Sequence, residues 1–482
     1  MELGDEPLSL TRSEAWAIAR LDAHDQAALV RNGEASADTL AEAAILRIEE
    51  IDPALNAVSY RAFDHARAAA KAIDRATPMA GAPVLLKASL SYPGFPQTSG
   101  SRARRHAVGT VAYPFARRLD AAGLVAVGMS AMPEFGLLCS GEALLTGPTL
   151  NPWDASRTAG GSSTGAAVAV ATGMVPYAHA SDAAGSIRVP AANCGVVGFK
   201  PSRGWNVRAR VHHLVDDLLC SDSLIARSVR DVAWALRMER PDELASVAVS
   251  RRPLRIALDL EGLSGPPDGE VADLVRKTAA LCADLGHRVE AVAMPIDRAA
   301  LREAIQTLWP YLGGDLVDLY SARHPGTPLS DLLEPWTIGL EEKRRSIPPE
   351  QLAQCYAAIT DGTRAVAEFH RGWDVVLSPV TRSAPLPLGA MAPTQPFERL
   401  WTTLFDYVDY TPLHNLVGTP SVSLPLGMTA DGLPIGSLLS AGQGADDLLL
   451  ALAAELEQAA PWADRWPPAA LPPAEVRRLQ SV

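Results

Sequence analysis

The sequence predicts an α/β protein in which a large mixed β-sheet is covered by helices on both faces. From about residue 81 onward, short apolar runs at 84–86, 124–127 and 196–199 alternate with glycine-rich turns and helical stretches. Runs that are apolar at every position are typical of strands buried on both faces of a sheet. The chain has 482 residues, of which 48% are apolar and 20% charged, a composition too apolar for a disordered protein.

The N-terminal part favours helices. Residues 10–75 are rich in Ala, Leu, Glu and Arg, and their apolar positions recur at spacings of three and four. Ser36 and Asp38 are start signals for one helix. We expect this helix to close at Asp52-Pro53, because the residue before a proline avoids the helical region.

The second half predicts further strands of the core and one long helical segment. Residues 255–259 and 287–292 favour strands on either side of a helix near 269–286. The runs at 374–379 and 421–425 are again short and apolar, like the strands expected for the core. We expect four regions within one compact domain: an N-terminal helical region (1–75), a core that carries the site motifs (76–250), an α/β and helical insertion or cap (251–372) and the C-terminal part of the core (373–482).

Charge and cysteine usage exclude several classes of protein. The chain has 43 Lys and Arg residues and 55 Asp and Glu residues, which gives a net charge of −12. This charge repels phosphate backbones, so no nucleic acid partner is expected. The longest apolar stretch, at 165–180, is interrupted by Gly173 and Pro176, so no membrane span is expected. Five scattered cysteines without a C-x-x-C pair and an acidic N-terminus predict a cytoplasmic protein.

Two serine-containing segments and one lysine carry the chemistry. Residues 160–167 read GGSSTGAA, residues 181–190 read SDAAGSIRVP, and Lys87 ends the first apolar run. Small residues let a backbone approach a reacting group, and consecutive N–H donors can then face an oxyanion. Each segment alone is typical of a loop or helix cap. Neither segment is a P-loop, and no Gly-x-Ser-x-Gly elbow surrounds Ser186.

Together the motifs resemble those of the amidase signature family. That resemblance spans essentially the whole chain. It implies the amidase signature fold and hydrolysis of C–N bonds in amides, with no cofactor and no metal. The matching segments are residues 81–87, 151–154, 160–167, 182–190, 194–204, 227–231, 415–420 and 432–436.

Three residues match the catalytic positions of this family. Ser186 matches the nucleophile, and Lys87 matches a lysine at the end of a buried strand. Ser162 matches the bridging serine, which follows a cis peptide bond in the family. The resemblance further implies an oxyanion hole made by the backbone amides of Ala183, Ala184, Gly185 and Ser186, and a supporting shell of Ser163, Asp182 and Arg188.

These roles require an unprotonated lysine. A serine hydroxyl is a poor nucleophile until a base removes its proton. Burial lowers the pKa of a lysine by up to about 3–5 units in fully buried cases, and the apolar run at 84–86 predicts such burial. Lys87 would then draw a proton from Ser162, and Ser162 from Ser186. Ser162 would later return the proton to the departing amine, and water would release the acyl group.

Two departures from the family pattern point to a branch. Ala88 stands where most members have aspartate after the lysine, and Ala184 stands where most have glycine. The second difference, together with residues 25–34, resembles the branch that contains cyclic nylon-oligomer hydrolases. We therefore expect a small-molecule substrate: an aryl amide, a nylon-type oligomer or a carbamate (urethane).

Candidates for the substrate pocket are one loop and several tryptophans. The pair His212-His213 has no accompanying ligand cluster, so a metal site is not expected. The pocket candidates are Leu137, Leu138, Cys139, Trp205, Trp309, Trp336 and Trp401.

Two other functions stay open. A glutamine-hydrolysing component of a tRNA-dependent amidotransferase shares these motifs but requires partner subunits. A non-catalytic binding protein on the same scaffold would be expected to have lost Lys87, Ser162 or Ser186, and the sequence keeps all three. A homodimer is a further expectation from the resemblance.

Overall fold

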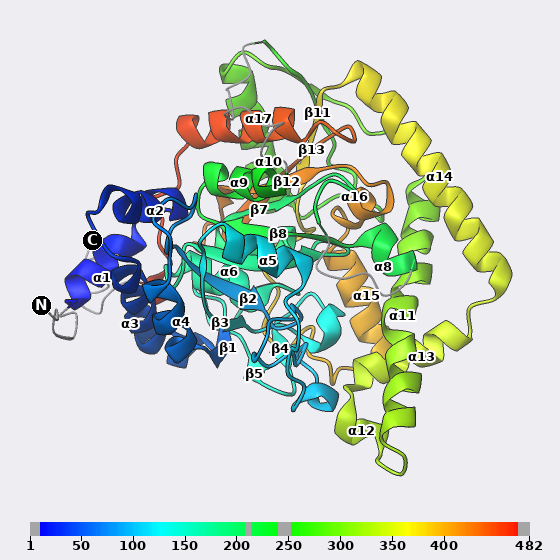
Figure 1. The fold of residues 1–482 in the computed structure, drawn as a ribbon. Helices are drawn as coiled ribbons and strands as arrows, with labels where there is room; N and C mark the ends of the chain where they lie inside the picture. Colours follow the sequence, from blue (N-terminus) through cyan, green and yellow to red (C-terminus); the bar gives the residue numbers. More distant parts are fainter. Residues whose placement is uncertain (1–9, 208–213, 240–251, 471–482) are drawn as a thin grey trace, which may run out of the picture.

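The computed structural model describes residues 10–207, 214–239 and 252–470. Within these residues, eleven strands form one mixed sheet in the order β1-β3-β2-β6-β8-β7-β12-β13-β11-β9-β10 (Figure 1). A separate small ribbon pairs β4 with β5. The strands are β1 (Val58–Arg61), β2 (Pro83–Lys87), β3 (Val125–Ser130), β4 (Glu142–Ala143), β5 (Gly147–Pro148), β6 (Tyr177–Asp182), β7 (Val197–Lys200), β8 (Ser221–Ala226), β9 (Arg255–Leu258), β10 (Arg288–Ala291), β11 (Val375–Pro379), β12 (Ser421–Met428) and β13 (Pro434–Ala441).

Helices cover both faces of the sheet, as expected (Figure 1). Successive side chains of a strand point to opposite faces, so Val84 and Leu86 of β2 join one buried cluster while Leu85 joins another. The first face is covered by α2 (Ala23–Asn32), α5 (Pro114–Ala121), α9 (Val229–Glu239), α10 (Gly269–Asp284) and α17 (Asp446–Ala459), and the second by α1 (Arg12–Ala19), α3 (Ala37–Leu55), α4 (Phe63–Lys71), α6 (Thr164–Ala171) and α7 (Arg188–Cys194).

A helical segment follows β10 and packs beside the sheet (Figure 1). Its two long helices contact each other, and a third buried cluster joins them to the helices that follow β11. The remaining helices are α8 (Leu214–Leu219), α11 (Arg298–Arg323), α12 (Leu329–Leu332), α13 (Pro335–Arg345), α14 (Pro349–Gly372), α15 (Phe397–Tyr407) and α16 (Pro412–Leu416).

The topology gathers the ends of two strands that carry polar side chains. Strands β2 and β6 are parallel neighbours. Lys87 ends β2, and Ser181 and Asp182 end β6. The carboxyl ends of parallel neighbours meet at one edge of a sheet, which is where ligands bind in α/β proteins.

Most sequence predictions for single elements hold, and two are wrong. Strand β1 lies within the N-terminal region that was expected to be helical, and one helix end is misplaced. The helix expected to close at Asp52-Pro53 continues to Leu55 and ends at Asn56, whose φ of 56° is left-handed. A proline in a last turn removes a single backbone hydrogen bond, and the Asp52 carboxylate accepts the N–H groups of Ala57 and the residue after it. The chain therefore turns after the proline.

The sheet draws strands from all four regions that the sequence suggested: β1 lies in 1–75, β9 and β10 in 251–372, and β11 to β13 in 373–482. The division into those regions stays a prediction. In the described part of the chain, no helix combines the length and the hydropathy of a membrane span.

Candidate active site

Lys87 lies at the centre of a cluster of hydroxyl groups. Its side chain is fully buried at the end of β2. The Nζ atom donates to the Oγ atoms of Ser162 at 2.8 Å, Ser163 at 2.9 Å and Ser181 at 3.0 Å. A lysine nitrogen can hold three such partners, because its ammonium form donates three hydrogen bonds and its neutral amine donates two and accepts one. Sequence reasoning missed Ser181 as part of this cluster, although it lies in the quoted SDAAGSIRVP segment.

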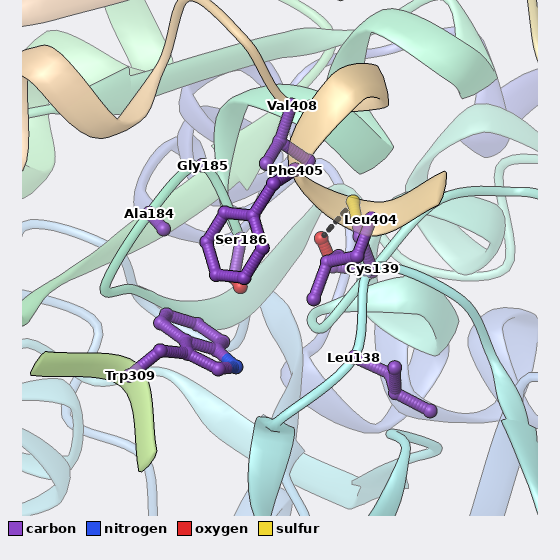
Figure 2. Close-up of a pocket in the computed structure, with 10 residues that line it drawn as sticks. Leu138, Cys139, Ala184, Gly185, Ser186, Trp309, Leu404, Phe405 and Val408 are labelled. Atoms are coloured by element: carbon purple, nitrogen blue, oxygen red, sulfur yellow. Dashed lines mark hydrogen bonds between the residues drawn. The ribbon is translucent and has the colours of Figure 1, made fainter. Parts of the chain in front are cut away.

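The loop before α6 delivers Ser162 to the lysine. The Gly161–Ser162 peptide bond is cis. Gly161 has no room for a side chain, because a Cβ there would lie 2.7 Å from the backbone nitrogen of Ser140. The carbonyl of Gly161 accepts a hydrogen bond from the Cys139 thiol at 3.5 Å (Figure 2). Close packing of this loop against residues 139–140 thus fixes the serine.

Ser186 follows β6 on a loop that a buried carboxylate holds in place. The Asp182 carboxylate accepts the N–H of Gly185 at 2.7 Å and that of Ile187 at 3.0 Å. It also accepts two hydrogen bonds from Arg188, and both side chains of this ion pair are fully buried. Burial acts to raise the pKa of Asp182, but the charge and hydrogen bonds of Arg188 outweigh it and hold that pKa well below its usual range.

The C-terminal part of the chain completes this support. Arg188 donates to the backbone carbonyl of Thr411 at 2.9 Å and to Asn415 Oδ1 at 2.6 Å. Asn415 Nδ2 in turn donates to Asp182 Oδ1 at 2.9 Å. Thr411 Oγ1 donates to the carbonyl of Ala184 at 2.6 Å. These partners lie more than 220 positions further along the chain, so only the fold brings them to the loop.

The predicted oxyanion donors need one correction. The N–H of Gly185 is directed at the Asp182 carboxylate, so this amide holds the loop and does not face a substrate. The amides of Ala183, Ala184 and Ser186 stay candidates. Gly185 itself is required for a different reason, because its φ is 131° and a Cβ would lie 2.3 Å from Thr411 Oγ1.

Two cavities meet at Ser186. The larger has a volume of about 460 Å³ and is bordered by Lys87, Ser162, Ser186 and the α11 side chains. The smaller has only about 10 Å³ of free space and lies among Ala184, Gly185, Ser186 and apolar side chains (Figure 2). Trp309 lines both cavities. Ser186, the candidate nucleophile, thus lies where the larger cavity meets the smaller one.

The comparisons with known proteins agree with this geometry. The amidase family model matches residues 39–450. This chain belongs to the amidase signature family. A putative amidase, AmiC, of Mycobacterium tuberculosis (strain ATCC 25618 / H37Rv) is 36% identical over 459 residues, covering 93% of this chain and 96% of the relative. The 6-aminohexanoate-cyclic-dimer hydrolase of Paenarthrobacter ureafaciens is 34% identical over 499 residues, covering 92% and 96%.

Solved structures give the same family. A 6-aminohexanoate cyclic dimer hydrolase complexed with substrate superposes with a TM-score of 0.87 at 30% identity, covering 94% of this chain and all of the other. A bacterial aryl acylamidase of the same family gives a TM-score of 0.84 at 26% identity, covering 95% and 100%. The expected fold and amide-hydrolysing class are therefore confirmed: the protein is an amidase that acts on non-peptide C–N bonds.

Among the pocket candidates of this amidase, one loop and one tryptophan reach the cavities. Leu137 lines the larger cavity, and Leu138 and Cys139 line the smaller. Burial raises the pKa of the Cys139 thiol to about 12, so this cysteine acts as an apolar wall. Trp309 belongs to both cavities, and its Nε1 donates to the Leu137 carbonyl at 3.3 Å.

The other three tryptophans do not line either cavity in the described structure. Trp336 is buried behind the wall and donates from Nε1 to the carbonyl of Leu137 at 3.0 Å. Trp401 packs against tilted aromatic rings and lines a separate hollow. Trp205 packs against the first core cluster, near Gly444. Each is held by core packing, the ordinary role of a tryptophan.

Sequence reasoning missed the walls supplied by α11 and α15. These helices have amphipathic patterns that look like any core-facing surface, so no local signal marks them. The His212-His213 pair lies outside the described residues, and within the described ones no cluster of three His, Cys, Asp or Glu side chains is arranged to hold a metal. The missed cavity residues include Leu312, Leu316, Leu319, Tyr320, Leu404, Phe405 and Val408.

Proposed function

We propose that the amidase works through an acyl-enzyme on Ser186, with Ser162 and Lys87 as a proton relay. The observation that carries this proposal is the 2.8 Å contact between Lys87 Nζ and Ser162 Oγ on the wall of a cavity that Ser186 shares. A serine nucleophile needs a base within reach, directly or through one group. Asp182 and Arg188 hold the nucleophile loop in this scheme.

The first half-reaction forms the acyl-enzyme. Ser186 Oγ bonds to the substrate carbonyl carbon while its proton passes to Ser162, and the proton of Ser162 passes to a neutral Lys87. The carbonyl oxygen becomes an oxyanion opposite the loop amides. The C–N bond then breaks, and the nitrogen takes a proton from Ser162, which recovers one from Lys87. The free amine leaves.

The second half-reaction releases the acyl group. A water oxygen bonds to the acyl carbon, gives its proton through the same relay, and the bond to Ser186 breaks with return of the proton to its Oγ. An amide yields a carboxylic acid. A carbamate yields a carbonic acid monoester, which decomposes to an alcohol and carbon dioxide.

We infer an aryl amide, a nylon-type oligomer or a carbamate as substrate. Relatives named for 6-aminohexanoate cyclic dimers and for aryl acylamides support the first two classes. The same acyl-enzyme chemistry covers a carbamate, which differs from an amide by one ester oxygen. The five free cysteines favour the cytoplasmic location predicted from the sequence, and a homodimer stays a prediction.

The glutamine-hydrolysing alternative has weaker support. The solved glutamyl-tRNA(Gln) amidotransferase chain of Thermotoga maritima is 23% identical to this protein, a likeness that shows the fold alone. Against a non-catalytic binding protein stands the hydrogen-bonded cluster around Lys87, which a binding scaffold does not require.

The test presents one aniline as acetanilide, as an alkyl carbamate and as a urea. Wild-type enzyme, Ser186→Ala and the control Ser330→Ala, at an exposed position of α12, are compared by amine release. We expect Ser186→Ala to lose at least about 10³-fold in kcat and Ser330→Ala to match wild type. Full activity in Ser186→Ala would refute the nucleophile. Ammonia release from glutamine, with none of the three anilides cleaved, would favour the amidotransferase alternative.

A further inference from the structure

The two compartments beside Ser186 differ sharply in size and chemistry. The smaller has about 10 Å³ of free space, close to the least that holds one water molecule, so it accepts one methyl-sized group. Apart from the Ser186 hydroxyl, its side-chain walls are apolar or the thiol of Cys139. The larger offers about 460 Å³, with apolar walls from α11 and charged groups, among them Arg104 and Arg323, at its lining.

The position of the proton relay decides which half of a substrate occupies each compartment. The departing nitrogen must receive a proton from Ser162, so it has to lie on the Ser162 side of the carbonyl carbon. Lys87 and Ser162 line the larger compartment and not the smaller one. The amine half therefore extends into the larger compartment, and the other substituent of the carbonyl enters the smaller.

We propose that this amidase is selective for short acyl groups on large amines and that Phe405 sets the limit on acyl length. The proposal rests on the proposed acyl-enzyme on Ser186. Its substrate class is amides of aryl or other bulky apolar amines in which the carbonyl carries a methyl group (acetyl), with the methoxy group of a methyl carbamate, one heavy atom longer, as the largest substituent.

Phe405 is placed to act as this limit. It lies on α15, is 3% exposed and borders the smaller compartment next to Ser186 (Figure 2). Its ring meets Trp309 edge-on, with centroids 6.2 Å apart, and packs against Trp401 at 4.8 Å. Removing the ring therefore extends the compartment toward Trp401, so the enlarged space stays apolar and suits a longer alkyl chain.

The larger compartment matches a bulky aromatic amine. Phe135, Leu312, Leu316 and Tyr320 supply apolar and aromatic surface along its length. The small size of the other compartment makes long-chain acyl groups, including 6-aminohexanoyl units, poor occupants of it. The favoured substrates are therefore aryl amides and short alkyl carbamates.

The experiment uses two substrate series. One aniline is acylated with acetyl, propionyl, butyryl and hexanoyl groups, and the acetyl group is placed on methylamine, aniline and a naphthylamine. Wild type, Phe405→Leu, Phe405→Ala and Leu316→Ala are compared by kcat/KM. Phe369→Leu, on α14 and stacked against Trp373, serves as the matched control outside both compartments.

We expect wild-type kcat/KM to fall at least about 10-fold from acetyl to butyryl, since one methylene in a fitted pocket changes rates by about 10–200-fold. Phe405→Leu should shrink this ratio and Phe405→Ala should bring it below threefold or invert it, with the amine ranking unchanged. Leu316→Ala should alter the amine ranking and leave the acyl ratio as in wild type. Phe369→Leu should change neither.

Two results would overturn the proposal: an acyl ratio near one in wild type, or Phe405 variants that alter the amine ranking while the acyl ratio stays constant. Mass spectrometry of Ser186 peptides after rapid quenching separates failure of the acyl-length limit from failure of the proposed acyl-enzyme. Absence of an acylated Ser186 peptide together with full amine release by Ser186→Ala refutes the acyl-enzyme. Equal acylation by acetyl and hexanoyl substrates refutes only the acyl-length limit. Phe405→Leu keeps an apolar side chain, so it tests the limit if Phe405→Ala does not fold.

Discussion

Replacing Asp182 by Asn tests the support of the nucleophile loop. The substitution keeps the shape of the side chain but exchanges one acceptor oxygen for an NH₂ group and removes the negative charge. Both carboxylate oxygens accept hydrogen bonds, from the N–H groups of Gly185 and Ile187 and from Arg188. Whichever way the new amide turns, its NH₂ group faces donors.

The magnitude follows from burial. Asp182 and Arg188 are both fully buried, and leaving one member of such a pair unpaired costs about 3–5 kcal/mol. The same change frees the Gly185 N–H, which positions the loop that carries Ser186. We therefore expect Asp182→Asn to lose about 3–5 kcal/mol of unfolding free energy and at least about 10²-fold in kcat, the effect of displacing a reacting group by about 1 Å.

Urea unfolding and steady-state kinetics measure the two effects. Asp361→Asn is the control, because its ion pair with Arg364 is exposed and such pairs contribute less than about 1 kcal/mol. An Asp182→Asn enzyme that unfolds within about 1 kcal/mol of wild type and keeps its kcat would refute the reasoning. If Asp182→Asn loses kcat but keeps its unfolding free energy, then Asp182 positions the loop that carries Ser186 without stabilising the fold.

Three further predictions concern single residues. Burial, followed by the charge of Glu134, raises the pKa of Glu334 to about 8; the folded state then binds more protons than the unfolded one between about pH 4.5 and 8, so stability falls as pH rises through this window. Glu334→Gln should remove part of that fall, and urea midpoints at about pH 6 and 8.5 that drop equally in both proteins would contradict it. Gly185→Ala should lower kcat by at least about 10²-fold, because its Cβ would lie 2.3 Å from Thr411 Oγ1; unchanged kinetics would show that the loop adapts. Lys87→Met should lower kcat by about 10²–10⁴-fold and the unfolding free energy by about 1–3 kcal/mol, measured by kinetics and urea, since the buried hydroxyls of Ser162, Ser163 and Ser181 lose a shared hydrogen-bond partner.

The sequence predicted those parts of the site that local segments encode. Lys87 ends an apolar run, and Ser162 and Ser186 each lie in a short segment of small residues, so the environment of each is encoded by its near neighbours in the chain. The strand order of the sheet explains why Lys87 is buried and why its Nζ meets the hydroxyl of Ser162. The Gly185 amide was assigned wrongly because motif resemblance does not say which way an N–H points.

The compartments were beyond sequence reasoning for a physical reason. Phe405 and Trp309 come from helices nearly 100 positions apart, and each occupies an apolar stripe that would equally suit a core. The same ambiguity made Trp336 and Trp401 look like wall residues, whereas both are packed behind the wall. Only tertiary packing distinguishes a ring that faces a cavity from one that supports it.

The loop at residues 133–139 links the helical segment to Ser162, the serine of the proposed relay. Its Glu134 carboxylate accepts the N–H of Glu334 at 2.8 Å and the hydroxyl of Thr337 at 2.6 Å, both at the start of α13. Three residues later, the Leu137 carbonyl accepts the indole N–H groups of Trp309 and Trp336. The Cys139 thiol then donates to the Gly161 carbonyl, next to Ser162. A shift of α13 would therefore reach the loop that carries Ser162 through one short backbone segment. We therefore expect substitutions that break the contacts of Glu134 with the start of α13 to alter kcat as well as substrate choice.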